Sequence, residues 1–418
     1  MNALFFYFTT LNIMRKKRHL AGGVITEEQA KQITGDINKE QDSDSQSVDS
    51  LSGGAITEEQ AKEIAEAMPN DILRTYVLPT VRYPLTDNVI HRAVERYFSP
   101  DPRRKNSVLQ RFGKIENWDV SHVTNMSSLF DIHYMFAGAT NYTLRASFNQ
   151  PIDTWDVSNV TSMNYMFRGA TSFNQPLDKW DVSNVRGMDG MFMKARSFNQ
   201  PLDKWDVSKV TSISVMFLDA TSFNQPLNNW DVSKVLNMRY MFKKATSFNQ
   251  PLNNWNGKLS NVTDMGGMFV YAEAFNQPLN DWNVSNVMYM HNMFMDAISF
   301  NQPLDNWNVS KVTNMGFMFY GATSFNQPLD DWDVSNVTDM GMFWMFACAT
   351  SFNQPLKNWD VQKVTRSTRE CDEYDASTGY VKILHAAEAD IHNTYSSDSD
   401  DAYGWDAESS TTSDPPPI

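Results

Sequence analysis

The chain has 418 residues and a formal net charge of −14 at pH 7. Its pI of about 4.9 argues against a nucleic-acid partner, because contacts to phosphates require a basic face. The two cysteines, Cys348 and Cys371, are too few for a disulfide framework, and the seven histidines show no metal-ligand spacing.

Residues 1–20 join an apolar stretch to a basic run. The apolar part, residues 3–14, is too short to span a membrane, and the basic residues 15–18 follow it, whereas a secretory signal places them first. No transmembrane span is therefore predicted. Two interpretations stay open: an anchor or targeting signal, and a gene-model start upstream of a true initiator at Met14.

Residues 21–70 read as an acidic linker in which the phrase ITEEQAK occurs twice. Thr26 and Thr57 each precede Glu-Glu-Gln, so each hydroxyl is placed to cap a short helix. The residues between the two copies are rich in Ser, Asp and Gly and contain too little apolar surface to fold alone. We therefore predict a linker with two marginal helices.

Residues 71–116 are predicted to form a helical cap. Two short helices are indicated by apolar residues at helical spacing, and Gly113 ends the second. These apolar residues are Val89, Ala93, Val94 and Tyr97 in the first helix, and Val108, Leu109 and Phe112 in the second. A helical segment directly before a repeat array is placed to cover its open end.

Residues 117–366 consist of successive copies of one sequence motif. Tryptophans recur every 25 residues from Trp155 to Trp255, and again from Trp282 to Trp332, with a step of 27 residues after each run. A fixed period of this length is typical of a repeat array, in which a unit buries its apolar side only against its neighbours.

One unit contains two periodic patterns. Trp180 and Val182 fall on one side of a predicted short strand. A predicted short helix follows, because four apolar residues have the spacing i, i+3, i+4 and i+7: Met188, Met191, Phe192 and Ala195. The pattern predicts an α/β repeat solenoid that is leucine-rich-repeat-like, with a short parallel strand and a short helix in each of about ten coils.

Stacking turns each position of the unit into a column. We expect the Trp and Met columns to be buried and the Asn column, which includes Asn174 and Asn199, to bond coil to coil. The column after Trp is the candidate exposed binding column: Asp156, Asp181, Asp206, Asp231, Asn283, Asn308, Asp333 and Asp360. Its charges are either solvated beside nearby Ser and Lys, or they bind a basic protein patch or divalent cations.

The phrases NWDVSHVTNMSSLF (residues 117–130) and WDVSNVTDMGMF (residues 332–343), with ATSFNQPL between coils, carry a family resemblance. They resemble BspA-like leucine-rich-repeat surface proteins and, more narrowly, the mycoplasma-lipoprotein-type repeat of 25 residues. The resemblance implies a non-enzymatic protein that binds an unidentified protein or cell-surface macromolecule, at the cell surface or outside the cell. It brings no catalytic residue, cofactor or metal.

Residues 367–418 leave the repeat rhythm. Residues 381–391 are predicted to form a helix over the last coil, and the Ser-rich acidic residues beyond it are predicted to be disordered. The expected function is a repeat scaffold for protein binding or adhesion. The alternative is a structural component inside a cell or a virion, without adhesion. An enzyme is disfavoured, because the carboxylates recur with the repeat and do not converge on one pocket.

Overall fold

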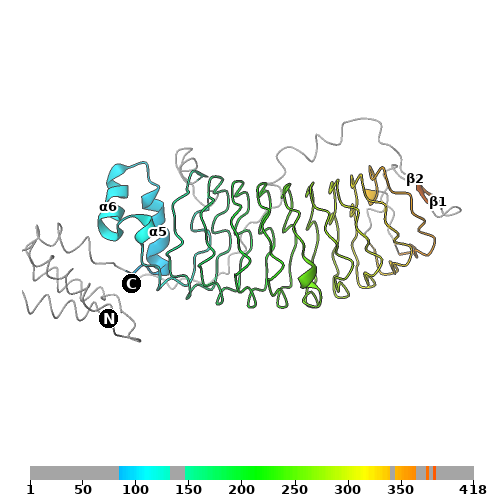
Figure 1. The fold of residues 1–418 in the computed structure, drawn as a ribbon, viewed down its shortest axis with the longest axis horizontal. Coiled ribbons are helices and arrows are strands. Elements are labelled where there is room, and N and C mark those ends of the chain that lie inside the picture. The colour runs from blue at the N-terminus through cyan, green and yellow to red at the C-terminus, as the bar shows by residue number, and fades with distance from the viewer. Residues whose placement is uncertain (1–83, 132–145, 339–343, 364–372, 376–379, 383–418) are drawn as a thin grey trace, which may run out of the picture.

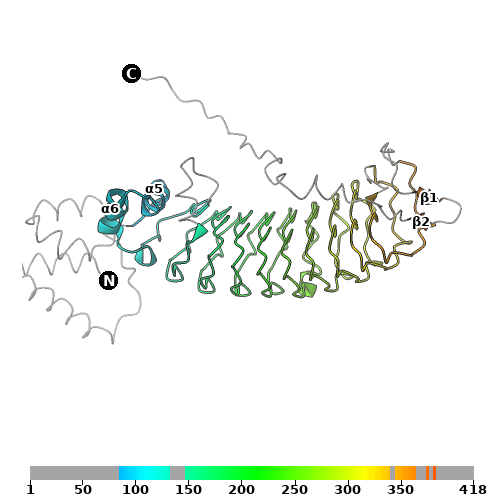
Figure 2. The same cartoon turned by 90° about the horizontal axis from the view of Figure 1, so that it is seen from above.

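The structure is a computed structural model that describes residues 84–131, 146–338, 344–363, 373–375 and 380–382. The predicted N-terminal segments, residues 1–20 and 21–70, lie outside the described residues, as do residues 383–391 of the predicted helix at 381–391 and the acidic tail after it. The two described residues of that predicted helix, Val381 and Lys382, lie in a short antiparallel strand instead. In Figures 1 and 2 the repeats form one row of stacked coils. Helices α5 (Asp87–Tyr97) and α6 (Pro102–Phe112) stand at one end and a small hairpin at the other.

Both helices predicted before the repeats are present. Asp101 caps α6 by accepting the backbone N–H of Arg103 at 2.9 Å, and Pro102 occupies the first turn, where its missing N–H costs nothing. Gly113, with φ of 73°, ends the helix. Within the described part of the chain, no helix combines the length and apolarity needed to cross a bilayer.

Helix α5 closes the core of the first coil. The Leu85 N–H donates to the Asp119 carbonyl at 2.8 Å, and the carboxylate of Asp87 accepts the backbone N–H and the hydroxyl of Thr124 at 2.7 and 2.6 Å. The ring of Phe98 meets that of Phe148 edge to face, 5.7 Å away. A single 3-10 turn, η2 (Ile115–Asn117), then leads into the coils. The apolar core thus runs from α5 into the array without a break.

The coils are joined by backbone hydrogen bonds, but the strand predicted around Trp180 and Val182 does not form. Its neighbouring N–H groups are used locally: Ser183 donates to the Asp181 side chain at 3.0 Å, and Val185 donates to the Val182 carbonyl at 2.9 Å. Single parallel bridges link adjacent coils farther along the unit instead, at Ser162, Gly187, Ser212 and the equivalent residues of the next coils.

The helix predicted over Met188–Ala195 is replaced by turns. Met191 N–H donates to the Met188 carbonyl three residues back, at 3.3 Å, whereas Phe192 N–H donates to Met216 of the next coil at 3.0 Å. In an α-helix each N–H donates to the carbonyl four residues back. An N–H that donates to the next coil cannot also do this, so the bonds between coils exclude the helix. The spacing of apolar residues nevertheless identified inward-facing positions, since Met188, Met191, Phe192 and Ala195 are all fully buried.

Each coil that is described throughout its turns, from Tyr165 and Gly169 to Phe317 and Gly321, contains two residues with left-handed backbone in the third position of a turn, as type II turns require. In one coil these are Gly190 (φ 56°) and Lys194 (φ 60°). Other coils place residues with side chains there, including the β-branched Val215 (φ 51°), at a cost of about 1 kcal/mol each. Gly190 also makes room for a neighbour, because a Cβ at this position would collide with ring carbons of Tyr165 in the preceding coil.

The buried aromatic side chains stack in continuous ladders. Phe192 lies 4.0 Å from Phe198 of its own coil and 5.7 Å from Phe217 of the next, measured between ring centroids. The tryptophans of the predicted column, from Trp118 to Trp359, are buried as well, which confirms that column, whereas Trp344 lies outside the column and is partly exposed. The indole N–H groups also form hydrogen bonds to the preceding coil: Trp205 Nε1–H donates to the Leu177 carbonyl at 3.0 Å, and Trp230 Nε1–H donates to the Leu202 carbonyl at 2.9 Å.

The Asn column bonds coil to coil as predicted. The side-chain oxygen of Asn199 accepts the backbone N–H of Asn224 at 2.9 Å and the amide of Gln225 at 3.0 Å. The same pair of bonds recurs along the array, so each link between neighbouring coils uses an Asn oxygen as acceptor and a Gln amide as donor.

Two further elements are present. The 3-10 turn η3 (Asn253–Trp255) lies within the row of coils, and the antiparallel hairpin of β1 (Glu373–Asp375) and β2 (Tyr380–Lys382) follows the last coil.

We predict that Trp205→Ala lowers the free energy of unfolding by about 3 to 5 kcal/mol, because it opens a cavity in the core and removes the bond to Leu177. Urea denaturation followed by fluorescence of the remaining tryptophans measures the loss. Lys204→Ala is the matched control: this exposed side chain lies 3.6 Å from Asp178, and its removal should change stability by less than about 0.5 kcal/mol. Equal stability losses in the two variants would place the indole outside the core.

We further predict that Gly190→Ala lowers the unfolding free energy by about 1 to 3 kcal/mol, from left-handed strain and displacement of the Tyr165 ring. In a Tyr165→Ala background the collision is absent, so the same substitution should cost only the strain, about 1 kcal/mol. A double-mutant cycle by thermal or urea unfolding separates the two contributions. Identical costs in both backgrounds would show that the ring does not lie over the glycine.

Candidate binding surface

The acidic column predicted as a binding surface lies at the surface but is engaged in local turns. Asp156, Asp181 and Asp206 are exposed, and Asp231 is half-buried. The Oδ1 atom of each accepts the backbone N–H of the Ser two residues later, at 3.0 to 3.1 Å. Asn283, Asn308 and Asp333 follow the same pattern, and Asp360 accepts the backbone N–H of Gln362 in place of a Ser.

These hydrogen bonds explain why either Asp or Asn can occupy the column. The turn needs only one acceptor oxygen, which both side chains supply. Donation from the Ser hydroxyl and the Ser backbone N–H also lowers the pKa of Asp181, Asp206 and Asp333. Local donors thus stabilise the charges that neighbouring coils place near one another. No group of three or more His, Cys, Asp or Glu side chains with metal-binding geometry occurs in the described ranges.

A second surface differs from coil to coil. We call it the variable face and define it as the residues at the two left-handed positions of each coil together with the residue before each. While the buried columns repeat the same residue type, this face carries aromatic and cationic side chains: Tyr165, Arg168, Lys194, Arg239, Tyr240, Lys243, Lys244, Tyr271, His291, Phe317 and Tyr320. All of these are partly exposed.

Cations lie over tyrosine rings at two places on the variable face. The Arg168 guanidinium is 5.0 Å from the Tyr165 ring centroid, and its terminal nitrogen pairs with buried Asp131 at 2.8 Å. Three coils farther along, Arg239 lies 4.9 Å and Lys243 5.2 Å from the ring of Tyr240. Because these side chains hold one another in place, the face presents ordered rings and charges without losing much side-chain entropy on binding.

The C-terminal part of the variable face is aromatic. Phe317 stacks on Trp344 of the next coil with centroids 6.2 Å apart, and Tyr320 lies 6.3 Å from the same indole. Burial and the neighbouring Asp296 raise the pKa of Tyr271 to about 12, and burial together with the Cys348 side chain raises that of Tyr320 to about 12. Both phenols therefore stay neutral and remain hydrogen-bond donors at physiological pH.

Sequence reasoning concentrated on the regular acidic column and missed the variable face. The signal was present: once the coils are aligned by their tryptophans, the positions after the first Met of each unit change from coil to coil. Their left-handed geometry was harder to read, since Lys194, Val215 and Tyr240 are residues that seldom adopt it.

Comparisons with known proteins identify the repeats. No curated protein and no solved structure shows a significant match. A model of a Mycoplasma protein family of unknown function, DUF285, matches residues 104–217, 176–259, 256–344 and 282–379. Together these overlapping matches span residues 104–379, which include most of α6, the coils and β1 but not β2, and which make up more than half of the chain. The chain therefore belongs to the family described as Mycoplasma protein of unknown function, DUF285.

Proposed function

We propose that this protein is a non-enzymatic repeat scaffold that binds another protein through the variable face. One observation carries the proposal: coils that are otherwise nearly identical differ on this face, and there they carry Tyr, Arg and Phe. These residue types dominate the binding energy of protein interfaces. An extended row of coils offers many such side chains in one surface, which is how other repeat arrays bind their partners.

The fold class is part of the same proposal. A leucine-rich-repeat-like solenoid is supported by parallel bridges that join the coils at one recurring position, even though turns take the place of the predicted helix. The resemblance of the repeated phrases to BspA-like surface proteins supports an adhesive role, with a partner at a cell surface or outside the cell. The regular acidic column then serves mainly to build turns, and the variable face supplies specificity.

The experiment compares three full-length proteins binding to intact source cells, with labelled protein and saturation analysis. We predict that Arg239→Ala with Tyr240→Ala weakens binding at least about tenfold, because it removes a ring and the cation stacked on it. The control, Asp181→Asn with Asp206→Asn, keeps the acceptor oxygen that the turns need and should bind like wild type.

Three results would count against the proposal. Wild-type affinity in the Arg239 and Tyr240 variant would exclude that part of the face. Loss of binding only in the Asp→Asn variant would assign the interaction to the acidic column. Absence of saturable binding by correctly folded wild-type protein would favour the alternative, a structural component without adhesion.

A further inference from the structure

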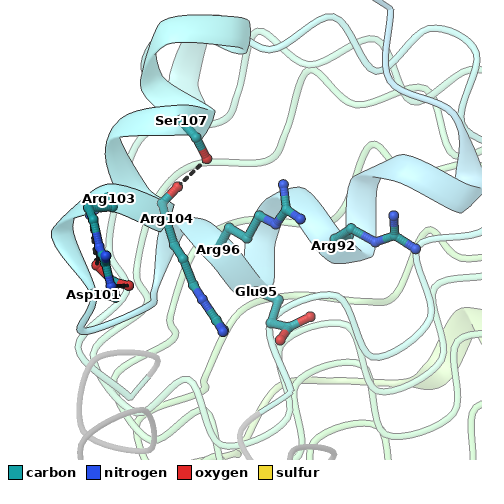
Figure 3. Close-up of a pocket in the computed structure, with 7 residues that line it drawn as sticks. All are labelled: Arg92, Glu95, Arg96, Asp101, Arg103, Arg104 and Ser107. Atoms are coloured by element: carbon teal, nitrogen blue, oxygen red, sulfur yellow. Dashed lines mark hydrogen bonds and ion pairs between the residues drawn. The ribbon is translucent and has the colours of Figure 1, made fainter.

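The two cap helices form a groove that the proposed function does not use. A hollow of about 590 Å³ lies between α5 and α6, and arginines from both helices line it. Figure 3 shows Arg92 and Arg96 on the same side of α5, one helical turn apart, and Arg104 extending from α6 past Glu95. The hollow is open to solvent along its length, so a chain segment could enter it.

The rim of this groove carries more cations than carboxylates, and three of its arginines are not held in an ion pair, although Glu95 also lines the hollow. Arg103 is paired with Asp101 at 3.1 Å, and Asp87 is bonded to the first coil. The side chains of Arg92, Arg96 and Arg104 are exposed, and none of them makes a hydrogen bond or ion pair with a described residue. Residues 84–117 hold seven Lys or Arg against four Asp or Glu, so the cap is locally basic in a chain of net charge −14.

The floor of the groove is apolar. A second hollow of about 290 Å³ continues from the first, sharing Arg92 and Arg96, and its lining includes Val89, Val108 and Phe112. Val89 and Phe112 are only partly buried against the core. A cationic rim above an apolar floor fits an amphipathic segment with carboxylates beside a narrow apolar stripe, as in the recognition of a helix by a groove.

We propose that the groove binds the chain's own acidic segment, residues 57–68, which begins at the Thr of the second ITEEQAK phrase (residues 56–62). This segment lies outside the described residues, and its sequence contains the features that match the groove. Its apolar residues have the spacing i, i+3, i+4 and i+7: Ala61, Ile64, Ala65 and Met68. Its acidic residues are Glu58, Glu59, Glu63 and Glu66. The apolar stripe is complementary to the apolar floor of the groove, and the glutamates are opposite in charge to the arginines of its rim.

Connectivity favours this occupant over other acidic chains. Residues 69–83 link the segment to the cap, and 15 extended residues reach about 50 Å, whereas α5, with 11 residues, is only about 16 Å long. A tether of this length gives an effective concentration in the millimolar range. The first copy of the phrase, from Thr26, has two glutamates in place of four and a shorter apolar stripe, so it is the weaker ligand.

Hydrogen–deuterium exchange on the full-length protein tests the proposal by reporting protection of the amides of residues 57–68. In wild type these amides should exchange at least about tenfold more slowly than in a synthetic peptide of the same sequence. Arg92→Gln with Arg96→Gln and Arg104→Gln should abolish the protection, as should high salt. Arg103→Gln is the matched control and should leave it unchanged, because that guanidinium is already paired.

A charge exchange separates recognition from unfolding. Arg92→Glu, Arg96→Glu and Arg104→Glu should remove the protection, and adding Glu58→Arg, Glu59→Arg and Glu63→Arg should restore it. Unchanged protection of α5 and α6 amides verifies that every variant keeps its cap. The proposal is overturned by unprotected wild-type residues 57–68, or by protection that the glutamine variant retains. Protection that rises with protein concentration would assign the groove to a second copy and overturn the intramolecular docking.

Discussion

The interaction on which this molecule depends is the stacking of one coil on the next. A single coil has no helix or strand of its own to satisfy its backbone, and its Trp, Met and Phe side chains cannot be buried without a neighbour. Stacking supplies both needs together, because alternate N–H groups in the turns bond to the next coil while the rings of Phe167, Phe192, Phe217 and Phe242 lie 5.6 to 5.7 Å apart along the row. The tryptophan indoles add one side-chain bond per coil to the same stack.

This constraint divides the residues of a coil into two kinds. Inward positions must match the coil before and the coil after, so the Phe and Ala columns repeat the same residue through the described coils. Outward positions near the left-handed turns contact few fixed neighbours and differ from coil to coil. Local packing still applies there, as the Tyr240 ring over Gly267 shows. Function in a repeat array is expected where the stack permits variation.

Three features could be predicted from the sequence: the buried columns, the coil-to-coil Asn bonds and both cap helices. Each depends on residue spacing or on capping residues, which can be read directly from the sequence. The strand and the helix of the coil could not. The spacing of Met188, Met191 and Phe192 suits a helix, yet successive turns with left-handed residues bury the same positions. Nothing about Lys194 or Val215 by itself indicates a left-handed backbone, since the neighbouring coils impose it.

The acidic column shows a similar limit at the level of function. Its regularity suggested a binding ribbon, and its exposure was predicted correctly for Asp181 and Asp206. The turns that these carboxylates build depend on the position of the N–H two residues later, which the periodicity did not reveal. Regular recurrence in a repeat is therefore better evidence for a structural role than for recognition.

The stacked arrangement is tested most directly by the hydrogen exchange of the indole N–H groups, followed by NMR on the intact protein. If each coil donates from its indole to the coil before it, the protons of Trp180, Trp205 and Trp230 exchange only when coils separate or the array unfolds. Exchange of these protons as fast as in free tryptophan would contradict the account, because the coils would then not be stacked.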